Sequence, residues 1–197
     1  MKLLLRLSLQ WLSLRLKKLQ MTEAARPTSL VDSPENRWYA CFVKPRAEKA
    51  VAARMTGAGV ECYLPLQRIR RRWSDRIKWV DEPLIRSYVF VKVNNKSFRK
   101  VLFIEGFLRF ITFESRAVPI PDWQIEALKL ILEKGVDLEV TAGSFEAGQQ
   151  VEVIAGPLIG LKGELVEARG NKRMLLRLDQ INHGILVTID STLLARI

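Results

Sequence analysis

The sequence has few of the side chains on which metal sites and nucleophilic catalysis depend. Its 197 residues include two cysteines, Cys41 and Cys62, and one histidine, His183. The cysteines lie far apart without a CxxC motif, so a zinc site is excluded and both are interpreted as buried thiols of a reducing compartment. His183 falls in a predicted turn and is interpreted as solvated. The acidic residues are scattered singly, so we expect no catalytic residue, metal, cofactor or small-molecule substrate.

The sequence also lacks an apolar run long enough to cross a membrane. A transmembrane helix needs about 20 apolar residues, and Arg6 and Arg15 interrupt the leucine-rich start of the chain. The spacing of the leucines instead predicts a basic amphipathic helix over residues 1–20. Two interpretations stay open: a mis-called start ahead of Met21, or a membrane-surface or partner helix. The leucine stripe consists of Leu5, Leu9, Leu12, Leu16 and Leu19.

The sequence has fewer acidic than basic residues, and the difference is concentrated in one part of the chain. Lys and Arg number 32 against 21 Asp and Glu, a net charge of +11, while 48% of residues are hydrophobic and can form a core. Residues 37–140 carry a net +8, whereas residues 141–197 sum to zero. The excess favours polyanionic partners, nucleic acid before a membrane surface. The contrast predicts two domains with different tasks.

The middle segment alternates strand and helix patterns. Strands are predicted at 38–43, 62–66, 83–93 and 107–113, and helices at 46–55, after Asn94-Asn95, and from Pro121-Asp122. This order predicts an α+β domain, an antiparallel sheet flanked by helices. In the run 83–93 we expect Ile85, Val89, Val91 and Val93 on one face. Leu84, Tyr88 and Phe90 share the other face with Arg86 and Lys92.

A strongly basic stretch separates two of these strands. It predicts either a solvated hairpin or a projection that follows phosphates, with Trp73 available for base stacking or for contact with a protein. Its cations are interleaved with Trp73 and Trp79 and comprise Arg68, Arg70, Arg71, Arg72, Arg76 and Lys78.

The last fifty residues predict a small all-β barrel of the SH3 type. Alternating strands at 146–154, 164–167, 174–178 and 185–189 are joined by glycine-containing turns. Gly156, Gly160 and Gly163 suit tight turns or close backbone approach. A phosphate-binding loop is excluded, because Leu161 stands where that loop needs a glycine before its lysine.

Several segments of the sequence, taken in their order along the chain, resemble a known family. Arg37-Trp38-Tyr39, the stretch 44–49, Tyr63-Leu64-Pro65 and the run 82–91 resemble the N-terminal domain of NusG-type transcription elongation factors. The C-terminal segment resembles the KOW domain of the same family. The resemblance implies four parts: an extension and linker over 1–36, a NusG-type domain over 37–140, a linker over 141–147 and a KOW domain over 148–197.

The resemblance also implies partners for particular residues. An apolar patch of the first domain, matched here by Leu84, Tyr88, Phe90 and Phe110, would dock on the clamp helices of the large RNA polymerase subunit. Lys44 and the basic stretch would contact non-template DNA or nascent RNA. The KOW domain would bind ribosomal protein S-ten or the termination factor Rho, with Leu158, Ile159 and Leu161 as candidate contacts or, alternatively, barrel filling.

Within the family the chain looks similar to the specialised RfaH and UpxY-type antiterminators. It departs from RfaH at Glu105, where that protein has a basic residue used on DNA, and its alternating C-terminal strands favour a barrel over RfaH's helical form. We therefore expect a cytoplasmic, monomeric regulator that carries polymerase through pauses or terminators of long operons, such as those for polysaccharide synthesis. The alternative is a structural RNA binder of the ribosomal-protein type, which the neutral C-terminal segment disfavours.

Overall fold

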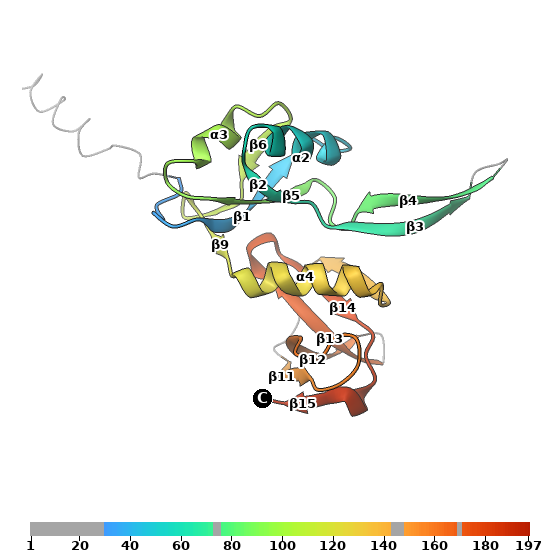
Figure 1. Cartoon of the computed structure of the whole chain (residues 1–197). Helices are drawn as coiled ribbons and strands as arrows, with labels where there is room; N and C mark the ends of the chain where they lie inside the picture. Colours follow the sequence, from blue (N-terminus) through green and yellow to red (C-terminus); the bar gives the residue numbers. More distant parts are fainter. Residues whose placement is uncertain (1–29, 73–75, 143–147, 169–170) are drawn as a thin grey trace, which may run out of the picture.

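A computed structural model describes residues 30–72, 76–142, 148–168 and 171–197. The expectations for residues 1–20 and for Trp73 lie outside these ranges. Within them the chain forms two antiparallel sheets with a helix between them and a projecting hairpin (Figure 1). The expected antiparallel sheet with flanking helices is confirmed. No helix of the described residues is both long and apolar enough to span a bilayer.

The first sheet has the strand order β2-β5-β1-β6, with the short β9 added to β1. Every pairing is antiparallel, and the longest, between β1 and β5, runs from Arg37 opposite Val93 to Phe42 opposite Tyr88. The strands are β1 (Arg37–Val43), β2 (Glu61–Tyr63), β5 (Tyr88–Val93), β6 (Phe107–Phe110) and β9 (Pro119–Ile120).

Two helices cover one face of this sheet, α2 (Glu48–Gly57) and α3 (Phe98–Leu102). Alternate strand residues reach them because successive side chains on a strand point to opposite faces. The core on this side joins Val51 and Met55 of α2 and Val101 of α3 to the inward strand residues. Those strand residues are Tyr39, Cys41, Val43, Val89, Val91, Val93 and Phe110.

The helix α4 (Asp122–Lys134) covers the other face and separates the two sheets (Figure 1). Ile125, Leu128 and Ile131 are fully buried, and they belong to a core that joins both sheets. The helix ends at Gly135, whose φ of 61° is the left-handed conformation that glycine adopts at little cost. The sequence predicted this helix but not its position between two layers.

The second sheet has the order β10-β14-β13-β12-β11-β15. Its strands are β10 (Leu138–Ala142), β11 (Gln149–Val153), β12 (Lys162–Ala168), β13 (Asn171–Leu178), β14 (His183–Val187) and β15 (Leu194–Arg196), with short 3-10 helices at Asp179–Ile181 and Ser191–Leu193. β10 pairs with β14 over its whole length, although the sequence analysis placed residues 138–140 in the first domain. The strand therefore joins the second sheet across the expected boundary.

The glycines of the second sheet behave as expected. Gly156 and Gly160 have φ values of 86° and 82°, in the left-handed region. Gly163 lies on β12, where a Cβ would stand 2.8 Å from the Leu175 carbonyl oxygen and 2.9 Å from the Met174 Cγ. The first two permit the turns, and the third permits the close approach of β12 and β13.

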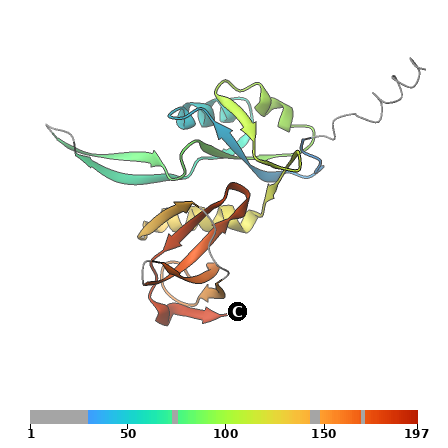
Figure 2. The ribbon, with the colours of Figure 1, turned by 180° about the vertical axis from the view of Figure 1, so that it is seen from behind.

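The hairpin consists of β3 (Leu66–Arg72) and β4 (Ile77–Pro83) and pairs with no other described strand. Seen from either side, it projects away from both sheets (Figures 1 and 2). A second small ribbon, β7 (Thr112–Phe113) with β8 (Arg116–Ala117), stands apart from the sheets. The basic stretch is therefore a freestanding two-stranded projection.

Candidate functional site

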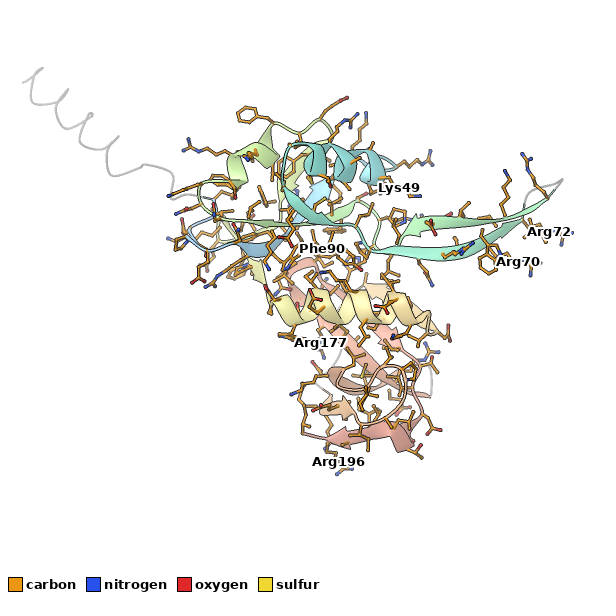
Figure 3. The ribbon with its side chains drawn as sticks, in the orientation of Figure 1. Lys49, Arg70, Arg72, Phe90, Arg177 and Arg196 are labelled. Atoms are coloured by element: carbon orange, nitrogen blue, oxygen red, sulfur yellow. The ribbon has the colours of Figure 1, made fainter. Side chains whose placement is uncertain are left out.

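The apolar patch, defined here as Leu84, Tyr88 and Phe90, lies on the α4 side of the first sheet. Phe90 is 0% exposed and stacks on Tyr63 at 6.5 Å between ring centroids. Leu84 is buried and Tyr88 half-buried. Figure 3 shows Phe90 between the first sheet and α4. All three side chains pack into the core shared with the second sheet, so the patch is covered in this arrangement.

The second sheet covers the patch through a small set of contacts. The rings of Tyr88 and His183 meet edge to face at 5.5 Å, and His183 Nδ1 lies 2.6 Å from the Ile181 carbonyl oxygen. Nearby, Gln180 Nε2 donates to the Pro119 carbonyl at 3.4 Å. His183, expected to be a solvated turn residue, is half-buried at the start of β14 against Tyr88.

Phe110 and Ile85 each lie on the face of the first sheet opposite to the one predicted. Phe110 packs with Tyr39 and Phe107 in the core beneath α2 and α3, so the structure does not bring it together with the patch. Ile85 packs with Leu84 and Phe90 rather than with Val89. The strand begins only at Tyr88, after a turn in which Ser87 has a φ of 64°, so strict alternation from residue 83 does not apply.

Two lysines, one on α4 and one on β5, lie beside aromatic rings on the α4 side of the first sheet. Lys129 Nζ lies 5.6 Å from the Trp38 ring centroid and 5.7 Å from that of Tyr63. Lys92 Nζ donates to Asp122 Oδ2 at 3.0 Å, and this hydrogen bond raises the pKa of Lys92. Burial raises the pKa of Tyr63 to about 12, because the phenolate would lose hydration there.

The described cations of the hairpin are exposed, and one of them forms a well-aligned ion pair. Arg71 donates from Nε and Nη2 to the two carboxylate oxygens of Glu82 at 2.8 and 2.9 Å. This hydrogen bonding lowers the pKa of Glu82 and raises that of Arg71. The guanidinium of Arg68 lies 5.7 Å from the Trp79 ring centroid. The other predicted cations, Arg70, Arg72, Arg76 and Lys78, are also exposed.

Lys44 is exposed at the end of β1, where its backbone N–H donates to the Gly106 carbonyl at 2.8 Å. Two residues on, Arg46 borders a cleft of about 510 Å³ that Lys49 and Arg86 also line and that reaches Glu82 at the base of the hairpin. Glu105, the departure from the RfaH pattern, is paired with Arg54 at 3.1 Å. Lys44 and the hairpin thus flank a cleft with further cations.

The three candidate contact residues of the second sheet differ in their exposure to solvent. Leu158 and Leu161 are buried, whereas Ile159 between them is 64% exposed. The turn holds this arrangement through a hydrogen bond from the Ile159 N–H to the Gly156 carbonyl at 3.2 Å. The alternative interpretation, interior packing, holds for the two leucines, and Ile159 alone is available to a partner.

Sequence reasoning missed two features of these surfaces. Trp79 was noted as interleaved but not proposed as a contact, although the register of the hairpin places it opposite Arg70. The Tyr88–His183 contact joins residues far apart in the chain, so no local pattern indicates it. Among the described residues, no group of three or more His, Cys, Asp and Glu side chains is arranged to hold a metal ion.

Comparison with known proteins agrees with this geometry for the first domain. Residues 36–129 match the family model described as NusG, transcription termination factor nusG. These residues, from β1 into α4, therefore form a NusG-type N-terminal domain, and the resemblance stated for this segment is confirmed.

The chain also matches solved structures. A structure described as domain interaction in Thermotoga maritima NusG is 17% identical, with a TM-score of 0.46, and the match covers 83% of this chain and 98% of that one. Conformation B of the MjSpt4:Spt5 complex is 15% identical, with a TM-score of 0.30, over 81% of this chain and 96% of that one. No curated protein sequence matches.

Proposed function

We propose that the protein is a transcription elongation regulator that binds RNA polymerase through the apolar patch. It acts without catalysis, carries polymerase through pauses or terminators in a restricted set of long operons, such as those for polysaccharide synthesis, and works as a cytoplasmic monomer. The match of residues 36–129 to the NusG family supports the class of function. The clamp helices of the large polymerase subunit are the proposed docking surface.

The observation that carries this proposal is the composition of the patch and of what covers it. Tyr88 and Phe90 of β5, together with Leu84 just before that strand, form an apolar face of the NusG-type domain, and part of their cover comes from the second sheet. Polymerase and the second sheet therefore compete for the same side chains. Binding of polymerase at the patch selects the arrangement in which the second sheet has moved away.

The covered arrangement makes the affinity adjustable. When only a fraction of molecules exposes the patch, the apparent Kd for polymerase rises by the inverse of that fraction. An edge-to-face aromatic pair contributes about 0.5–1.5 kcal/mol, so losing the Tyr88–His183 contact shifts the equilibrium about 2- to 10-fold. The second sheet, proposed to be a KOW domain, is then free to bind ribosomal protein S-ten or Rho, with Ile159 as its exposed apolar contact.

Nucleic acid is the second proposed partner of the first domain. Arg46 and Lys49, close to Lys44 in the chain, line the cleft that reaches Glu82 at the base of the hairpin, and the hairpin extends the cationic surface away from the fold (Figure 1). Non-template DNA or nascent RNA held there would steady the factor on the transcribing complex. Phosphate contacts of this kind depend on salt but not on sequence.

The test is a titration of the full chain against transcribing polymerase from its own host. His183→Ala removes one member of the covering contact and should tighten binding about 2- to 10-fold. Tyr88→Ala in the His183→Ala background should then weaken binding, because the Tyr88–His183 covering contact is already lost and removing the Tyr88 ring takes away its contact with polymerase. Phe113→Ala, an exposed aromatic on β7, is the matched control.

Two results would contradict the proposal. Equal affinity of the His183 variant and the double variant would remove Tyr88 from the polymerase contact. Failure of the full chain to bind transcribing polymerase at all would reject the function. A single-round transcription assay on the protein's own operon leader tests the outcome, since read-through should fall with the double variant.

A further inference from the structure

The hairpin has two faces of different chemistry, and its register determines which side chains share each. Directly paired residues of antiparallel strands point to the same side, and so do alternate residues of one strand. Arg70 is opposite Trp79, and Arg71 is opposite Lys78, so these two pairs lie on opposite faces. The first, here named the arginine–tryptophan face, consists of Arg68, Arg70, Arg72, Ile77, Trp79 and Asp81.

The arginine–tryptophan face is open and strongly cationic. Trp79 is 60% exposed, with the Arg68 guanidinium 5.7 Å from its ring centroid. Among the described residues, no carboxylate forms an ion pair with Arg70 or Arg72. Figure 3 shows both arginines on the hairpin, far from the two sheets. Three guanidinium groups face a single carboxylate, that of Asp81.

The opposite face is more nearly neutral and less open. Arg71 is held by both oxygens of Glu82, and the two apolar residues between them, Ile69 and Val80, are half-buried. Among the paired residues of this face, Lys78 is the remaining cation. A polyanion therefore gains more from the arginine–tryptophan face than from its reverse.

The spacing of the open face fits one class of ligand. Alternate residues on a strand are about 6.8 Å apart, close to the separation of successive phosphates along an extended nucleic-acid strand. An exposed indole offers a plane on which a base can stack, and only an unpaired strand has base faces free for stacking. Cations along a strand with an aromatic ring beside them are the arrangement that single-stranded nucleic acid needs.

We propose that the arginine–tryptophan face binds single-stranded nucleic acid, with a base stacked on Trp79 and phosphates held by Arg70 and Arg72. This inference rests on the proposed function for the general role of the hairpin, and it narrows that role to one face and one aromatic residue. DNA and RNA should bind alike, because phosphate and stacking contacts do not involve the 2′-hydroxyl group.

The test is fluorescence anisotropy with labelled oligo(dT) and oligo(U) of about 12 nucleotides, within the usual range of site sizes, and the full chain without polymerase. Trp79→Leu keeps an apolar side chain but loses stacking, and should weaken binding about tenfold. Trp79→Phe should retain most of the affinity. Arg70→Gln should weaken binding and make the slope of log affinity against log salt shallower by about 0.7.

Lys78→Gln is the matched control, because it removes the same charge from the opposite face, one register position along the hairpin from Arg70. It should leave affinity close to that of the unmodified chain. Equal weakening by Lys78→Gln and Arg70→Gln would overturn the assignment to one face. Binding of one sugar type alone, or full affinity of Trp79→Leu, would overturn the stacking mechanism.

The outcome separates this inference from the proposed function because no polymerase is present. If neither oligonucleotide binds while the Tyr88 and His183 variants alter polymerase affinity as expected, the inference fails and the function stands. If Trp79→Leu and Arg70→Gln weaken polymerase binding but leave oligonucleotide binding unchanged, the face contacts protein and the inference is again overturned. Oligonucleotide binding by a chain that ignores polymerase supports the inference and rejects the function.

Discussion

The apolar patch and the hairpin are both surfaces that the sequence marks for binding, yet one is covered and the other is open. Tyr88 and Phe90 of the patch lie on β5 inside the first sheet, Leu84 lies just before that strand, and α4 and the second sheet bury Phe90 completely. The hairpin pairs only with itself among the described strands and leaves Trp79 60% exposed. The difference shows that the exposure of a strand face depends on whether another layer of the same chain reaches it.

The physical reason is the cost of leaving each surface in water. Apolar area costs about 25 cal/mol per Å² when exposed, so the patch gains from any apolar layer that can cover it. Arginine side chains keep their guanidinium groups hydrated and gain little from burial. The apolar patch is therefore covered by the second sheet of the same chain, whereas the charged surface of the hairpin can stay exposed to solvent.

The sharpest contrast is in stability. Phe90→Ala should lower the free energy of unfolding by about 3–5 kcal/mol, because it empties a fully buried site between two layers. Trp79→Ala, although it removes a larger ring, should change stability by less than about 0.5 kcal/mol, since the ring is mostly in solvent. Urea unfolding followed by far-UV circular dichroism measures both. Similar losses for the two variants would mean that the hairpin packs on the fold.

The helices and most of the strands were predictable from local pattern, and so were the glycine turns, but β10 was not predicted. The period of the apolar residues and the left-handed positions of Gly156 and Gly160 are encoded within a few neighbouring residues. The side of the sheet that each residue faces was less predictable. Ser87 at positive φ ends the alternation before Tyr88, and this placed Ile85 on the side opposite to that expected.

The candidate sites depend on contacts that no local pattern encodes. The positions of Leu84, Tyr88 and Phe90 on one face followed from the sequence, but part of their cover comes from the second sheet, where His183 contacts Tyr88 from far along the chain. Likewise Leu158, Ile159 and Leu161 are equally apolar in sequence, and only the fold of their turn leaves Ile159 outside. Composition identifies a surface, and tertiary packing decides whether it is accessible.

A pair of Arg–Glu bridges sharpens the comparison between buried and open regions. Arg177 donates to both oxygens of Glu164 at 2.7 and 2.9 Å in the second sheet, nearly the same geometry as Arg71 with Glu82. Glu164 also accepts from the Gly148 N–H at 3.0 Å and is mostly buried. Glu164→Gln should therefore cost about 1.5–3 kcal/mol, the range for hydrogen bonds to a charged group, whereas Glu82→Gln should leave unfolding unchanged.

The pH dependence of stability tests the role of the buried Arg177–Glu164 pair in a second way. The hydrogen bonds from Arg177 and Gly148 hold the pKa of Glu164 below its ordinary value. A carboxyl whose pKa is lowered by folding contributes stability above its unfolded pKa, near 4.5, and loses it as the pH falls through its folded pKa. Urea midpoints between pH 7 and 3 should fall less steeply for Glu164→Gln. Parallel curves for this variant and the unmodified chain would remove Glu164 from the acid response.

The smallest expected effect is a change in the tyrosine absorbance titration, and it concerns Tyr63 next to the apolar patch. Tyr63 stacks on Phe90, and burial raises its pKa to about 12. Because the folded value exceeds the unfolded value of about 10, the contribution of Tyr63 to stability is complete below pH 10 and is lost as the pH rises through 12. Absorbance at 295 nm should show a last tyrosine titrating near pH 12, absent in Tyr63→Phe and unchanged in Trp79→Leu. If the last titration remained in Tyr63→Phe, the buried phenol would be another tyrosine, and Tyr63 would lie on an open surface like that of the hairpin.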